Sequence, residues 1–167
     1  MYRAEKYPNF DLEKFYQFVN SELLYLVEYE DEWLAACCNA VALLHHQLAD
    51  INWVGFYLIK NGLLLLGPFQ GKPACSSIVV GNGVCGQAAL RRETILVPDV
   101  HLFSGHIACD TASQSEIVIP LVKEGQLYGV LDIDSPSIGR FGLADQVGLE
   151  AFVAILMEHV SWEKVAF

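Results

Sequence analysis

The chain has 167 residues, 53% of them hydrophobic, and carries a formal net charge of −10 at pH 7. This length suits one domain, residues 1–167, and the hydrophobic content excludes a disordered chain. The acidic balance argues against binding to nucleic acid or to an anionic membrane, because both partners require a basic surface.

The first half of the chain predicts two helices and a hairpin. Apolar residues recur at helical spacing over residues 11–28, and an alanine- and leucine-rich stretch predicts a second helix over 31–48. Residues 52–60 are rich in β-branched and aromatic side chains, which favour a strand. The Asn61-Gly62 pair is a strong hairpin signal, so we expect the partner strand over 63–69.

The second half predicts short elements around a long loop. Two strands over 116–122 and 126–133 flank a Lys-Glu-Gly turn, and hairpins of this kind build an antiparallel sheet. With helices at both ends of the chain, the fold class is α+β, a central antiparallel sheet flanked by N- and C-terminal helices. A polar loop over 99–115 is long enough to suggest a functional role. The other expected elements are a strand over 76–80, a turn over 81–83, a helix over 84–92, a strand over 95–98 and a closing helix over 143–162.

The strand residues divide into an aliphatic face and a polar, aromatic face, because side chains on a strand alternate in direction. The aliphatic face is expected to be core and carries Val54, Phe56, Leu58, Leu127, Leu131 and Ile133. The opposite face carries Trp53, Gly55, Tyr57, Tyr128, Asp132 and Asp134. This composition suits a pocket for a small zwitterion, since aromatic rings and carboxylates both attract an ammonium group. An ordinary solvent-facing surface is the alternative that the pattern leaves open.

The cysteines fall into two groups. The first ten residues lack the apolar core of a signal peptide, so we expect a cytoplasmic protein, in which a structural disulfide framework is disfavoured. Cys37 and Cys38 lie in an apolar helical stretch and are expected to be core. Cys75, Cys85 and Cys109 lie among glycines, polar residues and turn formers, where one thiol can attack and others can resolve the oxidised product. Cys85 follows the start of a predicted helix, whose partial positive charge favours the reactive thiolate.

Two further motifs have simpler explanations. Residues 81–86 match G-x-G-x-x-G, but the helix that follows is short and the flanking strands form hairpins, so the glycines indicate a tight turn more than a dinucleotide site. His101, His106 and Cys109 could hold a metal, yet they lack the paired spacing of known metal motifs. The histidines could instead favour the thiolate form of a nearby cysteine. We therefore expect no metal site.

Several segments together resemble the free methionine-(R)-sulfoxide reductases, which are single-domain enzymes with the GAF fold. The resemblance is strongest from about residue 52 to residue 160. Generic GAF sensor domains are not expected to keep all three cysteines and all three acids. The matching segments are Asn52-Trp-Val-Gly-Phe-Tyr57, Gly67-Pro-Phe-Gln-Gly-Lys-Pro-Ala-Cys75, Gly83-Val-Cys-Gly86, Cys109-Asp110, Ser115-Glu-Ile-Val118 and Leu131-Asp-Ile-Asp-Ser135.

The resemblance implies a reaction and a role for each matching residue. It implies reduction of free L-methionine-(R)-S-oxide to L-methionine, with Cys109 attacking the sulfoxide. Cys75 or Cys85 would then form a disulfide with it, Cys75 being the preferred first partner, and thioredoxin would reduce that disulfide. It also implies a homodimer that needs no metal or organic cofactor. The residues implied to hold or activate the substrate, with the proton donor left open among the acids, are Trp53, Tyr57, Glu116, Asp132 and Asp134.

Two other functions are compatible with the sequence. A GAF module that senses a small molecule without catalysis usually belongs to a longer chain with an output domain. This sequence ends at Phe167, which favours an enzyme. A metal- or nitrosyl-responsive cysteine protein is the second alternative, and metal analysis of the purified chain would test it.

Overall fold

The computed structural model describes residues 11–105 and 110–165, and its elements follow the predicted order. Between β4 and β5 the described residues form only one short 3-10 helix, Val100–Leu102, in agreement with the predicted loop. The helices are α1 (Leu12–Val27), α2 (Trp33–Gln47), α3 (Gly83–Arg91) and α4 (Leu143–His159). The strands are β1 (Trp53–Lys60), β2 (Leu63–Gly71), β3 (Ser77–Val79), β4 (Ile95–Val97), β5 (Ser115–Lys123) and β6 (Gln126–Ser135).

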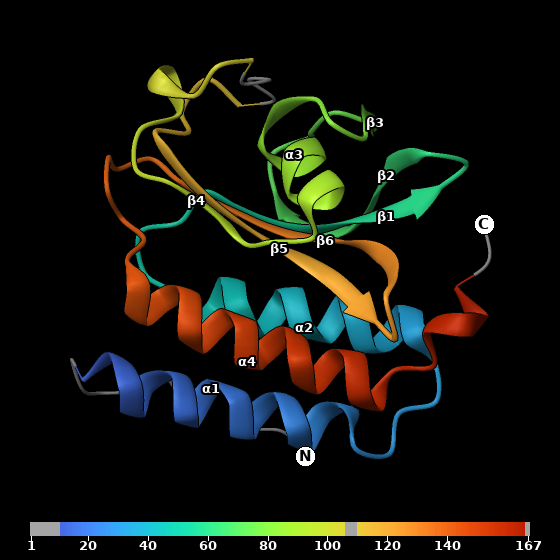
Figure 1. Ribbon diagram of the computed structural model, residues 1–167. Coiled ribbons are helices and arrows are strands. Elements are labelled where there is room, and N and C mark those ends of the chain that lie inside the picture. Colours follow the sequence, from blue (N-terminus) through green and yellow to red (C-terminus); the bar gives the residue numbers. More distant parts are fainter. Residues whose placement is uncertain (1–10, 106–109, 166–167) are drawn as a thin grey trace.

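The described strands form one sheet in the order β3-β2-β1-β6-β5-β4, and every neighbouring pair is antiparallel. Figure 1 shows α2 and α4 covering one face of this sheet, with α1 forming an outer layer against them. The short helix α3 lies on the opposite face. The predicted α+β fold with a central antiparallel sheet and flanking terminal helices is therefore confirmed.

The larger core lies between the sheet and the helices α1, α2 and α4. Val54, Phe56 and Leu58 of β1 are fully buried on this side, as the alternation along the strand predicts. A buried polar link also joins two of the helices, because the Tyr16 hydroxyl on α1 donates a 2.7 Å hydrogen bond to the carboxylate of Asp145 on α4. This core leaves the opposite face of the central strands to α3.

The prediction that Leu127 faces the helical core and Tyr128 the opposite side is wrong. Tyr128 packs against the helical core and lies 5.9 Å from the Trp162 ring, whereas Leu127 packs on the α3 side. The cause is a register shift next to Leu121, where β6 contains one more residue than β5. Such a bulge inverts the alternation beyond it, so the first residues of β6 exchange faces. Asp132 and Asp134 lie past the bulge, and there the predicted alternation is correct.

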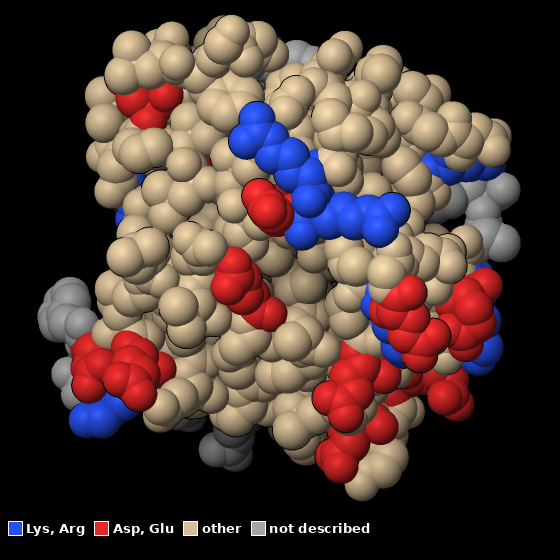
Figure 2. Space-filling view, in the orientation of Figure 1, with Lys and Arg blue, Asp and Glu red and all other residues tan. Residues whose placement is uncertain are grey.

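The surface charge is dispersed on the face that Figure 2 shows, where acidic side chains form several separate groups. Basic side chains are fewer there, in keeping with the net charge of −10. Within the described residues, no helix is both long and apolar enough to cross a membrane. The acids of chemical interest lie beneath α3, where Glu116 and Asp132 are buried and Asp134 is half-buried.

Candidate functional site

A cavity lies between the α3 side of the sheet and the N-terminus of α3. It lies on the polar, aromatic face of the strands, so the alternative of a plain solvent-facing sheet surface does not hold. The described residues that line it are Trp53, Tyr57, Ala74, Ile78, Asn82, Gly83, Val84, Cys85, Asp110, Ser113, Glu116, Asp132 and Asp134.

Three acids enter the cavity from the neighbouring strands β5 and β6. Glu116 pairs directly with Asp134 across these strands, and Asp132 lies two residues before Asp134 on the same face. Glu116 and Asp132 are buried, with 5% and 6% of their surfaces exposed. The opposite neighbour of Asp132 on β1 is Gly55, which has no side chain to fill the space above the sheet. The predicted grouping of these acids is therefore what the structure contains.

Burial shifts all three acids toward their protonated forms. Burial raises the pKa of Asp132 from 3.8 to about 6. Burial raises the pKa of Glu116 and that of Asp134 well above their usual values, and the negative charge of Asp132 raises both further. A hydrogen bond also joins Glu116 and Asp132. The cluster can therefore keep a proton near neutral pH and deliver it to a bound molecule.

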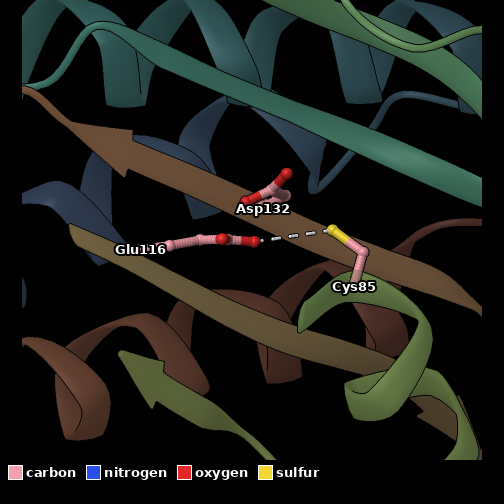
Figure 3. Close-up of side chains that lie close together, drawn as sticks. All are labelled: Cys85, Glu116 and Asp132. Atoms are coloured by element: carbon pink, nitrogen blue, oxygen red, sulfur yellow. Dashed lines mark hydrogen bonds between the residues drawn. The ribbon is translucent and has the colours of Figure 1, made fainter. Parts of the chain in front are cut away.

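The thiol of Cys85 points at these acids from the first turn of α3. Its Sγ lies 3.9 Å from Oε1 of Glu116, and Figure 3 shows Cys85, Glu116 and Asp132 converging from α3, β5 and β6. Burial raises the pKa of Cys85 well above that of a free thiol, and the charges of Asp132 and Glu116 raise it further. The expectation of a thiolate at this helix end is therefore wrong, because desolvation and neighbouring carboxylates outweigh the partial charge of a nine-residue helix.

Two aromatic residues of β1 line the cavity and also fasten the segment that carries Cys75. The rings of Trp53 and Tyr57 are stacked with centroids 5.8 Å apart. Nε1 of Trp53 donates a 3.1 Å hydrogen bond to the carbonyl of Lys72, and the Tyr57 hydroxyl donates one of 3.1 Å to the carbonyl of Cys75. The predicted pocket aromatics thus lie in the site, and they also hold the backbone on both sides of residues 73–74.

Asp110 links that same segment to the residues before β5. Its carboxylate accepts hydrogen bonds from Nδ2 of Asn52 at 3.2 Å and from the backbone amide of Ala112 at 2.9 Å. It also accepts one from Nζ of Lys72 at 3.3 Å. Hydrogen bonds from the Ala112 amide and the Lys72 and Asn52 side chains lower the pKa of Asp110. Asp110 therefore stays ionised as an anchor.

Sequence reasoning missed Ser113, which lines the cavity and accepts a 3.1 Å hydrogen bond from Asn52. A hydrogen bond from Ser113 also lowers the pKa of Asp134, against the effect of burial. The surrounding loop sequence is polar and aperiodic, so no local pattern identifies this serine. Asn52 and Asp110 could have been found, since both stand in the segments that match the reductases.

The cysteines differ in state. Cys75 takes part in a disulfide bond, whereas Cys37, Cys38 and Cys85 are free thiols. Cys37 is buried as predicted, but Cys38 is exposed, so the prediction that both are core is wrong for Cys38. The two positions are adjacent on α2 and therefore point to different sides of that helix. Cys109 lies outside the described residues.

The structure describes the whole glycine motif of residues 81–86 but only part of the possible metal motif. Gly81 and Gly83 have φ of +97° and +62°, and a Cβ at Gly86 would lie 2.5 Å from the carbonyl of Val79. These glycines thus serve a tight turn and close packing, as predicted. His101 is exposed and lies 3.3 Å from the Gln114 side chain. His106 lies outside the described residues.

Comparison with known proteins identifies relatives over most of the chain. The GAF domain family model matches residues 33–161. A protein named free methionine-R-sulfoxide reductase from Escherichia coli (strain K12) is 52% identical over 143 residues, which cover 86% of this chain and 87% of that protein.

Solved structures agree with these matches. The X-ray structure of free methionine-R-sulfoxide reductase from Neisseria meningitidis in complex with its substrate is 37% identical, with a TM-score of 0.91 over 95% of each chain. The reduced form of fRMsr of Staphylococcus aureus is 49% identical, with a TM-score of 0.84 over 86% of this chain and 94% of that one. The chain therefore belongs to the GAF domain family, among the free methionine-R-sulfoxide reductases.

Proposed function

We propose that this chain is an oxidoreductase that reduces free L-methionine-(R)-S-oxide to L-methionine. The observation that carries the proposal is the cluster of Glu116, Asp132 and Asp134 in one cavity beside Trp53 and Tyr57. The carboxylates and rings suit the ammonium group of a free amino acid. The names of the relatives point to the same substrate.

The proposed chemistry begins with Cys109. Its thiolate attacks the sulfoxide sulfur while one acid of the cluster gives a proton to the sulfoxide oxygen. Methionine leaves, and the sulfoxide oxygen passes to the sulfur of Cys109, which becomes a sulfenic acid. The raised pKa values of Glu116, Asp132 and Asp134 support the donor role, because an acid must keep its proton near neutral pH to give it.

In the second half of the cycle, a resolving thiol condenses with the sulfenic acid to form a disulfide and water. Cys75 is our choice for this role. Its participation in a disulfide, beside a buried Cys85 that is a free thiol with a raised pKa, supports that choice. Cytoplasmic thioredoxin then reduces the disulfide by thiol exchange, so that the reaction needs no resident metal or organic cofactor.

The decisive assay supplies each diastereomer of free methionine sulfoxide together with thioredoxin and its reductase. We expect turnover of the R form alone and none of the S form. Pre-reduced wild-type enzyme without thioredoxin should release a single equivalent of methionine, and Cys109→Ser should release none. A full equivalent from Cys109→Ser would exclude Cys109 as the nucleophile, and absence of turnover with both diastereomers would exclude the reaction itself.

The homodimer suggested by the resemblance stays a prediction. Light scattering of the purified chain at several concentrations tests it directly, and a constant monomer mass would contradict it.

A further inference from the structure

Three metal-ligating groups from three different elements meet inside the cavity. The Sγ of Cys85 and carboxylate oxygens of Glu116 and Asp132 all lie within 4.8 Å of one another. The three side chains are buried, and Figure 3 shows them pointing toward a common space. The reductase chemistry proposed above uses Glu116 and Asp132 to hold and activate a substrate and gives Cys85 no step, so the geometry of the three as a ligand set is a separate property.

One atom of this group lacks the partner that its burial requires. Oδ1 of Asp132 has no hydrogen-bond partner, although only 6% of the Asp132 surface is exposed. A buried acceptor without a partner is costly and is uncommon in native structures. No lysine or arginine is found among the described residues that line the cavity. Oδ1 of Asp132 is therefore a buried acceptor that a bound cation would satisfy.

We propose that Cys85, Glu116 and Asp132 form a binding site for a thiophilic divalent cation, Zn²⁺, within the substrate cavity. Cysteine sulfur and carboxylate oxygen are both ligands that zinc accepts, and with these three a fourth position stays open to water. Tetrahedral zinc would place sulfur and oxygen ligands about 3.6 Å apart. The observed separation of 3.9 Å between Cys85 and Glu116 requires only small side-chain movements to reach this.

Zinc binding at this site releases protons, which keeps the charge balanced. The metal replaces the proton of the Cys85 thiol and the proton held between the two carboxyl groups, and both protons pass to the solvent. No electrons are transferred. Asp134 adds a further negative charge on the same side of the cavity. Because the metal takes the carboxylates that a substrate ammonium would use, zinc and the amino acid exclude one another.

Calorimetric titration of the full chain with ZnCl₂ alone tests the site. The oxidised protein is the suitable form, because Cys75 is then held in a disulfide and cannot contribute a thiolate. We expect a single site in the wild-type protein and an affinity at least about tenfold lower in Cys85→Ser and in Asp132→Asn. Cys38→Ser removes an exposed thiol outside the site and should bind like the wild type. Equal affinity in wild type, Cys85→Ser and Asp132→Asn would overturn the proposal, and so would absence of binding to the wild type.

Titration with Co²⁺ gives a second readout that does not depend on affinity. A cobalt–thiolate charge-transfer band should appear in the wild type and in Cys38→Ser, and it should be absent from Cys85→Ser. Persistence of the band in Cys85→Ser would assign the metal to another thiol and overturn the site. Circular dichroism checks the fold of each variant, and Asp132→Asn keeps the test valid if Cys85→Ser does not fold. Both titrations use the metal alone, so their failure is distinct from failure of the reductase activity.

Discussion

Glu116 on β5 and Asp134 on β6 are direct cross-strand partners, and both enter the same cavity. Like charges opposite one another on neighbouring strands destabilise a sheet. Asp132 adds a third carboxyl group, and burial raises the pKa of all three. The free protein thus keeps an electrostatically unfavourable arrangement at its site, which a cationic group on a ligand would relieve.

Removal of one of these charges should stabilise the folded protein at neutral pH. The pKa of Asp132 is about 6 in the folded protein against an ordinary value of 3.8, so the native state binds more protons than the unfolded state in this range. The contribution of Asp132 to the free energy of unfolding is therefore fully present below about pH 4. It is lost as the pH rises through about 6. We expect Asp132→Asn to raise the free energy of unfolding at pH 7 by roughly 1 to 3 kcal/mol and to reduce activity.

Urea unfolding from pH 4 to pH 8 measures this effect, and the acidic end provides the internal control. The difference between Asp132→Asn and the wild type should shrink toward pH 4. A difference that is constant across the pH range would show that the titration of Asp132 does not govern stability.

Cys38 and Cys85, two of the free cysteines, should differ in reactivity. Cys38 is exposed, whereas Cys85 is 4% exposed and has a raised pKa because burial and nearby carboxylates disfavour its thiolate. Since only the thiolate reacts, we expect iodoacetamide to modify Cys38 at least about tenfold faster than Cys85 at pH 8. Peptide mass spectrometry over time gives both rates in one sample. Equal rates would contradict the buried, protonated state of Cys85.

Asp110 should matter through position. It directly follows Cys109 in the sequence, and its carboxylate is hydrogen-bonded to the Asn52 side chain and the Ala112 amide. We expect Asp110→Ala to lower kcat/KM by about tenfold to a hundredfold, mainly through kcat, because reacting groups misplaced by an ångström lose this much. Asp110→Asn keeps one acceptor oxygen and should recover part of the loss.

Lys72→Met is the matched control for the charge of Asp110. It removes only the ion pair with Asp110, in which the lysine side chain is 68% exposed. Such exposed pairs contribute little, so activity should change by less than about fivefold. If Lys72→Met matched the loss seen in Asp110→Ala, the ion pair and not the hydrogen-bonded anchor would be responsible.

Gly55 should be required for the position of the Trp53 ring. A Cβ at residue 55 would lie 2.5 Å from Cη2 of Trp53 and 2.5 Å from Cβ of Phe69. We expect Gly55→Ala to destabilise the protein by about 1 to 3 kcal/mol and to raise KM more than it lowers kcat, because the indole must leave its place in the cavity wall. Steady-state kinetics and thermal unfolding measure the two effects.

Gly142→Ala provides the comparison for Gly55→Ala. The nearest neighbour of a Cβ at residue 142 would be a carboxylate oxygen of Asp145 at 3.9 Å, an ordinary contact. Its KM should equal that of the wild type. A rise in KM in both glycine variants would indicate a general effect of altered stability and would remove the specific role of Gly55.

The local sequence was sufficient to predict the helices and strands and, for most strand residues, the face of the sheet on which each side chain lies. Apolar residues at helical spacing and the Asn61-Gly62 turn predicted α1, α2 and the first hairpin nearly to the residue. Alternation placed Trp53 and Tyr57 opposite the helical core for the same reason, since the direction of a strand side chain is a local property. Alternation also placed Asp132 and Asp134 on that face, and the resemblance to the reductases added Glu116.

Tertiary structure decided what the local pattern could not contain. The extra residue of β6 near Tyr128 depends on pairing with β5, so its effect on facing is invisible in either strand alone. The chemical state of Cys85 depends likewise on carboxylates from β5 and β6 that lie 31 and 47 residues away in the sequence. A helix end by itself favours a thiolate. Only the folded sheet brings Glu116 and Asp132 against that end and excludes water, and together these keep the proton on the sulfur.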